Sequence, residues 1–106
     1  MPPDVIMITF QISGYLTEFT AGQGEIRIDA QAENVGQALA ELWRRHTGLR
    51  DRVLTEQREV RPHVNLFVNS EVVSRERVLQ VPISGDTEIC IMPAVSGGEA
   101  VLEFQL

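Results

Sequence analysis

The feature that most constrains the fold is a change of hydrophobic period in the first half of the chain. Residues 5–13 read VIMITFQIS and residues 25–30 read EIRIDA, with an apolar residue at every second position. This alternation is typical of strands that bury one face. The glycine-containing segment between them predicts a long hairpin connection. Residues 34–46, NVGQALAELWRRH, instead space their apolar residues three and four apart, which predicts an amphipathic helix.

The expected helix carries its own boundary signals. Asn34 followed by Gln37 resembles a capping box, in which each side chain satisfies backbone N–H groups at the helix start. Arg44 and Arg45 complement the helix dipole near the last turn. Gly48 is placed to end the helix.

The second half of the chain is expected to return to the same sheet. A charged stretch before Pro62 predicts a short second helix, residues 63–69 a strand, and residues 70–73 a short turn or edge strand. The turn Ser84-Gly85-Asp86 precedes a last strand at residues 87–95. Pairing should fail near Pro93, which has no N–H to donate. Two strands, a helix and further strands predict an α+β domain with the helix on one face of the sheet.

Composition narrows the class of protein. A chain of 106 residues with 43% apolar residues fits one globular domain. The net charge of −6 disfavours nucleic acid and anionic membranes as partners, because both select clustered basic residues. The first apolar run is too short to span a bilayer and lacks the flanks of a signal peptide. With Cys90 as the single cysteine, we expect a cytoplasmic protein.

Signs of a self-sufficient enzyme are missing from the sequence. It contains no glycine-rich phosphate loop, and His46 and His63 have no acidic or cysteine neighbours at metal-ligand spacing. Cys90 has no recognisable histidine partner. We therefore expect no bound cofactor or metal, and a role that depends on other proteins.

The pair Gly97-Gly98 has two interpretations. Two glycines supply the positive φ angles of a tight turn, after which VLEFQL would pair back as an added strand. Taken from the residues alone, the turn is favoured. The alternative is that the pair is the working end of a protein that has not yet been trimmed.

Three segments together resemble a known family: VGQALAELWRRHTGLRDRVL from Val35, HVNLFVNSEVV from His63, and SGDTEICIMPAVSGG from Ser84. In order and spacing they are similar to the sulfur carriers of the ubiquitin-like β-grasp fold, such as the small subunit of molybdopterin synthase (MoaD) and the thiamine sulfur carrier (ThiS). The similarity is greatest to the subgroup that serves cysteine and siderophore-type biosynthesis. The resemblance implies a mixed sheet of four to five strands with one main helix packed on one face.

The resemblance also implies a role for the glycine pair. Gly98 would be the mature C-terminus, whose carboxylate is adenylated with ATP and then converted to a thiocarboxylate. Ser96 and Gly97 would thread a narrow channel, since residues with little or no side chain pass most easily. Here Gly98 is followed by EAVLEFQL, so its carboxyl group lies in a peptide bond. The resemblance therefore divides the chain into a carrier domain, residues 1–98, and an extension, residues 99–106, that is removed at Gly98–Glu99.

Partners follow from the same resemblance. They are an adenylyltransferase of the ubiquitin-activating type (similar to MoeB and ThiF), a JAMM zinc metalloprotease that removes the extension, and a biosynthetic enzyme that accepts the sulfur. Phe67, Cys90 and Met92 should project from the sheet face opposite the core, either as ordinary exposed apolar residues or as a docking patch. For the docking surface we expect Phe67, Met92, Pro93 and Ala94.

Two other functions stay open. A ubiquitin-like modifier would join Gly98 to amines on target proteins. An unprocessed binding module would keep its extension as a strand or as a partner-binding segment. All nine basic residues are arginines, so chains of such a modifier would not grow through lysine.

Overall fold

The computed structural model describes residues 5–93 of the chain. Its elements, in chain order, are β1 (Ile6–Ile12), the 3-10 helix η1 (Gly14–Thr20), β2 (Glu25–Ala30), α1 (Val35–Arg45), α2 (Thr47–Val53), β3 (Val64–Val68), β4 (Glu71–Val72), the 3-10 helix η2 (Val78–Gln80) and β5 (Thr87–Pro93). The hairpin connection, the main helix and the short second helix are all present as predicted.

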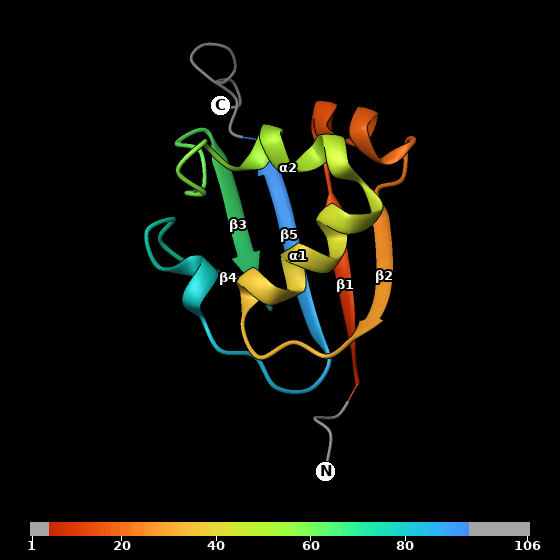
Figure 1. Cartoon of the computed structure of the whole chain (residues 1–106), viewed down its shortest axis with the longest axis vertical. Helices are drawn as coiled ribbons and strands as arrows, with labels where there is room; N and C mark the ends of the chain where they lie inside the picture. Colours follow the sequence, from red (N-terminus) through yellow and green to blue (C-terminus); the bar gives the residue numbers. More distant parts are fainter. Residues whose placement is uncertain (1–4, 94–106) are drawn as a thin grey trace.

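The strands form one mixed sheet of five in the order β2-β1-β5-β3-β4. The last strand, β5, lies at the centre, parallel to β1 and antiparallel to β3. Figure 1 shows α1 and α2 lying across one face of this sheet. This is the ubiquitin-like β-grasp, as the resemblance implied. Among residues 5–93, no helix is both long and apolar enough to cross a membrane.

The core lies between the sheet and α1. The predicted alternation is confirmed in both strands of the hairpin, because every second residue of β1 and of β2 is buried. The stripe of α1 faces the same interior, while Trp43 is only partly buried against it. The largest fully buried side chains are Phe10, Ile8, Leu16, Ile28, Leu39, Leu42, Leu49, Ile89 and Ile91. Full burial of an apolar side chain of this size stabilises the folded state by about 1.5–3 kcal/mol, because the side chain is removed from water.

Two side chains make capping hydrogen bonds at the start of α1. The Asn34 Oδ1 atom accepts a hydrogen bond from the Gln37 N–H at 2.8 Å. The Gln37 Oε1 atom in turn accepts from the N–H of Glu33 at 2.8 Å. The predicted capping box is therefore present, with its return bond made one residue earlier than the usual pattern.

The prediction that Gly48 ends the helix is wrong. Helix α1 ends at Arg45, and Gly48 lies inside α2, which starts at Thr47. The bend falls at His46, whose φ of −135° and ψ of 74° break the helix without a glycine. Burial explains the early break: the new direction of α2 places Leu49 and Val53 completely in the core.

The strand predicted at residues 63–69 is shorter in the structure, where β3 spans Val64–Val68 and Asn69 belongs to the turn that follows. Asn69 and Ser70 both have positive φ, 51° and 71°, which suits a two-residue hairpin loop into β4. Asn69 also holds the first part of β5. Its N–H donates to the Glu88 carbonyl at 2.8 Å, and its Oδ1 accepts from the Glu88 N–H at 2.9 Å.

Candidate functional site

The C-terminal end of β5 is held firmly in the sheet. Ile89 and Ile91 have no exposed surface, and β5 pairs with β1 as far as Ile91 and with β3 as far as Pro93. The Ser13 N–H extends this pairing by donating to the Ile91 carbonyl at 3.2 Å. The position of Pro93, the last described residue, is therefore fixed by a paired central strand.

A glycine makes room for the end of this strand. Gly14 has a φ of +66°, and a Cβ atom built on it would lie 2.9 Å from Cγ of Pro93. The Pro93 ring thus packs against the backbone at the start of η1, in a space that a side chain at Gly14 would fill. Because Pro93 pairs with Val64 at a position that needs no N–H donor, the proline takes part in the strand without breaking the ladder.

Five of the predicted site residues lie outside the described residues: Ala94, Ser96, Gly97, Gly98 and Glu99. The adenylation site, the threading residues and the cleavage site therefore stay predictions. What the structure describes is the surface from which they continue.

That surface carries an apolar cluster on the outer face of the sheet, the face opposite the helices. We call this cluster the outer-face patch and define it as Phe67, Val72, Cys90 and Met92. The register places Phe67 between Cys90 on β5 and Val72 on β4. Val72 is 74% exposed and Met92 42%, which is high for apolar side chains of this size. Phe67 and Cys90 are half-buried.

Met92 and Pro93, which we expected on one docking surface, lie on opposite faces of the sheet. Phe67 and Met92 share the outer face, as predicted, but Pro93 is one position further along β5 and packs toward Gly14 on the helix side. Sequence reasoning missed Val72. Its contribution depends on the pairing with Phe67, and the only signal in the sequence was the expected edge strand at residues 70–73.

Polar groups border the patch on the β1 side. Gln11 lies beside Cys90 in the register, and its Nε2 donates to Glu25 at 3.3 Å and to Glu88 at 3.5 Å. Further out on β2, Arg27 and Glu25 form an exposed ion pair of 2.8 Å. On the outer face, the apolar patch over β5, β3 and β4 therefore gives way to polar side chains toward β1 and β2.

Cys90 has the properties of a structural residue rather than a nucleophile. Burial raises the pKa of its thiol, and the nearby Glu88 carboxylate raises that pKa further. A thiol with a raised pKa is protonated near neutral pH and reacts slowly, because the thiolate is the reactive form. In the outer-face patch Cys90 acts as a small apolar side chain.

Comparison with protein families identifies the family of the chain. The model of the ThiS family matches residues 10–98. The chain belongs to the ThiS family. The match includes Gly97 and Gly98 and ends there, so the extension from Glu99 lies beyond the part shared with the family.

Individual relatives are small carriers and modifiers rather than enzymes. The sulfur carrier protein CysO of Mycobacterium tuberculosis is 28% identical over 93 residues, covering 86% of this chain and 98% of CysO. The small archaeal modifier protein 1 of Haloferax volcanii is 33% identical over 79 residues, covering 74% of this chain and 86% of the modifier. This ThiS-family chain is thus similar to proteins of both kinds.

Solved structures agree on the fold. A chain in the crystal structure of the Amycolatopsis orientalis BexX/CysO complex superposes with a TM-score of 0.73 at 26% identity, covering 86% of this chain and 99% of the other. A TM-score of this size over nearly the whole of the other chain means that the two chains share the β-grasp fold.

Proposed function

We propose that this protein is the precursor of a sulfur carrier, and that its working end is Gly98. One observation carries the proposal: the match to the ThiS family ends at the second glycine, eight residues before the last residue of the sequence. Hydrolysis of the Gly98–Glu99 bond would release a chain that ends where the family pattern ends. A zinc metalloprotease of the JAMM type supplies the metal-activated water that such a cleavage needs.

After cleavage the chemistry takes place on the new carboxylate. Its oxygen attacks the α-phosphorus of ATP, pyrophosphate leaves, and an acyl adenylate forms. Sulfide from a donor then displaces AMP and leaves a thiocarboxylate on Gly98. The chain supplies no catalytic side chain to these steps. It presents the acyl group, and the ATP and the catalytic residues belong to the adenylating enzyme.

The outer-face patch is the part of the described surface that we assign to that enzyme. Met92 presents exposed apolar area next to Pro93, and Val72 extends the patch across β3 to β4, so an enzyme seated on the patch would lie close to the last described residue of β5. Apolar clusters of this kind are typical of protein-binding sites. That a relative, CysO, forms a complex with BexX supports a carrier that works through complexes with other proteins.

A modifier function is the second candidate, favoured by the likeness to small archaeal modifier protein 1. It needs the same processing and adenylation, but Gly98 would be passed to an amine of a target protein instead of to sulfide. An unprocessed module that keeps residues 99–106 is the third. The three candidates differ in the covalent state of Gly98, which makes them separable by one measurement.

That measurement is the intact mass of the protein recovered from its own host without reducing agents or strong acid. A chain that ends at Gly98 with one oxygen replaced by sulfur is the expected result. Gly98 in amide linkage to other proteins would support the modifier instead. A chain that keeps all 106 residues while its partner enzymes are present would overturn both candidates that require processing.

Gly98→Ala is the matching variant, and we expect it to abolish formation of the thiocarboxylate. Gly24→Ala is its control, because a Cβ at Gly24 would meet only an ordinary contact, 3.5 Å from the Ile12 carbonyl oxygen. The control should be processed and thiocarboxylated as the parent is. Undiminished thiocarboxylate from Gly98→Ala would contradict the assignment of Gly98.

A further inference from the structure

Strand β3 is paired along its whole length on one side only. Toward β5 the ladder runs from Val64 to Val68, but toward β4 it includes only Phe67 and Val68. Among residues 5–93, therefore, no strand lies beside residues 64–66 on the outer edge of the sheet. An unpaired strand edge of this kind attracts another strand, and natural proteins usually cover it.

The backbone of Leu66 is oriented toward this open edge. In an antiparallel ladder, residues alternate between those whose N–H and C=O face the partner and those that face away. Asn69 bonds to Glu88 through its N–H, so Asn65 and Phe67 are in phase with it and face β5. Val64 and Leu66 face away. The Val64 N–H is bonded within a turn to the Arg61 carbonyl at 3.0 Å, so within the described part of the chain Leu66 is the edge position without a backbone partner.

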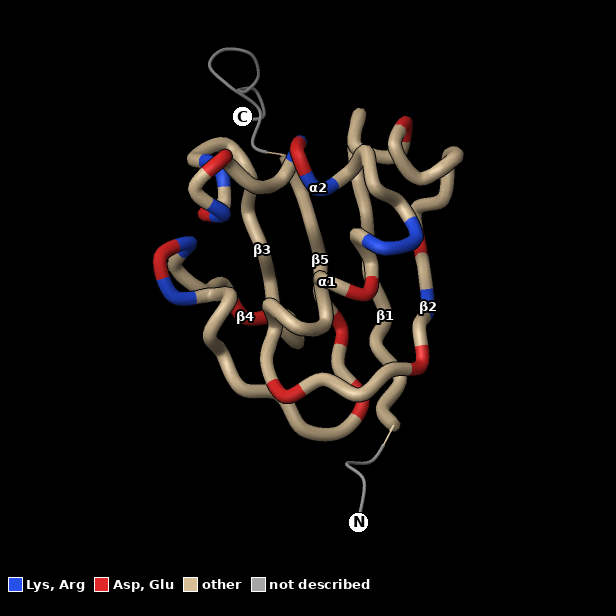
Figure 2. Tube along the Cα trace, viewed as in Figure 1, with Lys and Arg blue, Asp and Glu red and all other residues tan. Residues whose placement is uncertain are grey.

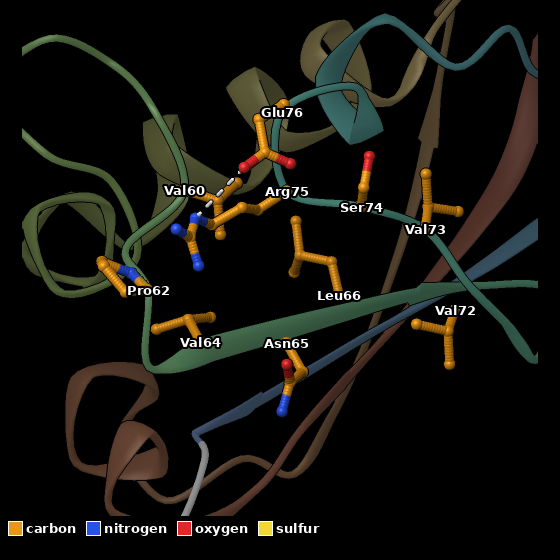
Figure 3. Close-up of a pocket in the computed structure, with 10 residues that line it drawn as sticks. All are labelled: Val60, Pro62, Val64, Asn65, Leu66, Val72, Val73, Ser74, Arg75 and Glu76. Atoms are coloured by element: carbon orange, nitrogen blue, oxygen red, sulfur yellow. Dashed lines mark ion pairs between the residues drawn. The ribbon is translucent and has the colours of Figure 1, made fainter.

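A groove of about 290 Å³ lies along this edge, lined by Val60, Pro62, Val64, Asn65, Leu66, Val72, Val73, Ser74, Arg75 and Glu76. Figure 3 shows Val64 and Leu66 pointing into the space between the loop that bears Val60 and the segment that bears Ser74. Its floor is apolar: Val60, Val64 and Leu66 are each at most 3% exposed. The volume lies at the lower limit of small-molecule pockets, and an open groove beside a free strand edge suits the side chains of an extended peptide.

Charge does not select the occupant. Figure 2 shows basic and acidic residues alternating in the two loops that flank the groove. Arg75, the cation on the rim, already lies 3.8 Å from Glu76. The groove therefore selects by apolar fit and backbone pairing, which an alternating segment provides.

We propose that this groove binds the protein's own extension, with residues 101–106, VLEFQL, in the groove and part of this segment paired with the open edge of β3 at residues 64–66. Leu102, Phe104 and Leu106 alternate with Val101, Glu103 and Gln105. In an extended segment one set points into the groove while the other faces solvent. The site is a binding site for an extended apolar peptide, and it does not depend on whether residues 99–106 are later removed.

The extension is long enough to reach the groove. Pro93, the last described residue, is in register with Val64, where the open edge begins. The outer side of β3 is about two strand spacings from β5, or roughly 10 Å. The residues from 94 to 98 span up to about 17 Å when extended, so the segment from residue 99 onward reaches the edge. It then runs parallel to β3, since β5 ends where β3 begins.

Docking in this way couples two parts of the molecule. While residues 101–106 occupy the groove, Gly97-Gly98 forms part of a connection tied at both ends, and its backbone is not available to thread a channel. Removal of the extension both frees Gly98 and uncovers the groove. Precursor and processed protein therefore differ in their surface as well as in their last residue.

Residue-resolved amide hydrogen exchange of the full chain tests the proposal. We expect the Leu66 N–H to be protected in the full chain and to exchange about tenfold faster or more in a Leu102→Asp/Phe104→Asp variant, the change expected from losing one backbone hydrogen bond. The control is Val101→Asp/Gln105→Asp. It adds the same charge at the interleaved positions and should leave Leu66 protected.

Each result decides the matter. An unprotected Leu66 in the full chain, or equal protection in both variants, overturns the proposal. Protection that weakens on dilution would mean that a second copy fills the groove, which also overturns it. Changes confined to Phe67 and Cys90 would place the extension on the outer-face patch instead. None of these readouts uses cleavage or thiocarboxylate formation, so the proposed function can fail while this site stands, and the reverse.

Discussion

The two faces of the sheet differ in what they do for the protein. On the helix side, Ile89 and Ile91 of β5 are completely buried against α1 and the neighbouring strands. On the outer side, Cys90 and Met92 of the same strand stay half-buried or exposed, beside an exposed Val72. Successive residues of β5 thus point alternately into the core and toward the outer face. The comparison teaches that adjacent residues of β5 contribute to the core and to the proposed docking surface.

The largest effect on stability is expected when the two faces of β5 are compared through the variants Ile91→Ala and Met92→Ala. Loss of the buried Ile91 side chain should lower the free energy of unfolding by about 2–5 kcal/mol, through lost burial and the cavity left behind. The exposed Met92 should change it by no more than about 0.5 kcal/mol. Urea denaturation of the two variants and the parent measures both. Equal losses would mean that the outer face contributes to stability as the core does.

Gly14→Ala tests how the end of β5 is held, and we expect a loss of about 1–3 kcal/mol from its left-handed backbone together with the contact to Pro93. Gly22→Ala is the matched control. Gly22 also has a positive φ, +81°, but a Cβ there meets nothing within 4 Å. Its loss should be the smaller one, of about 1 kcal/mol, because only the backbone term applies. Thermal or urea unfolding of the pair isolates the Pro93 contact, and identical losses would show that this contact is worth nothing.

Met92→Asp tests the outer-face patch as a docking surface. A charge in the middle of an apolar contact should weaken binding to the adenylating enzyme by about 1–2 kcal/mol or more, a tenfold or larger rise in KM for the carrier. Stability should hardly change. The assay is ATP–pyrophosphate exchange with the chain that ends at Gly98. The control, Arg27→Asp, alters charge on the polar half of the same face, over β2. An unchanged KM for Met92→Asp would remove the patch from the docking surface.

The smallest expected effect concerns Cys90 and pH. Since the folded protein raises the pKa of this thiol, it keeps the proton in a range where the unfolded chain, with a pKa of about 8.5, loses it. The contribution to stability is therefore complete below about pH 8.5 and is lost as pH rises through the folded pKa. Unfolding free energies of the parent and Cys90→Ser, measured from neutral to alkaline pH, should converge in that range. A constant difference would contradict the raised pKa.

Local patterns predicted most of the elements because local physics decides them. The period of two in residues 5–13 and 25–30 is a property of strands, and it was confirmed residue by residue in the burial of β1 and β2. The cap at Asn34 follows in the same way from groups three residues apart. The position of Gly48 shows the limit, since the break at His46 depends on where Leu49 and Val53 find the core.

By itself, then, the sequence determined which residues form strands and helices, which side of each is apolar, and that the chain resembles a sulfur carrier. Only the tertiary structure decided which strands are neighbours. The pairing of Phe67 with Val72, the contact of Pro93 with Gly14 and the open edge at Leu66 all follow from the strand order. These features join residues far apart in the chain or depend on where a partner strand stops. No local period encodes them, because they arise from the way the whole sheet closes over one core.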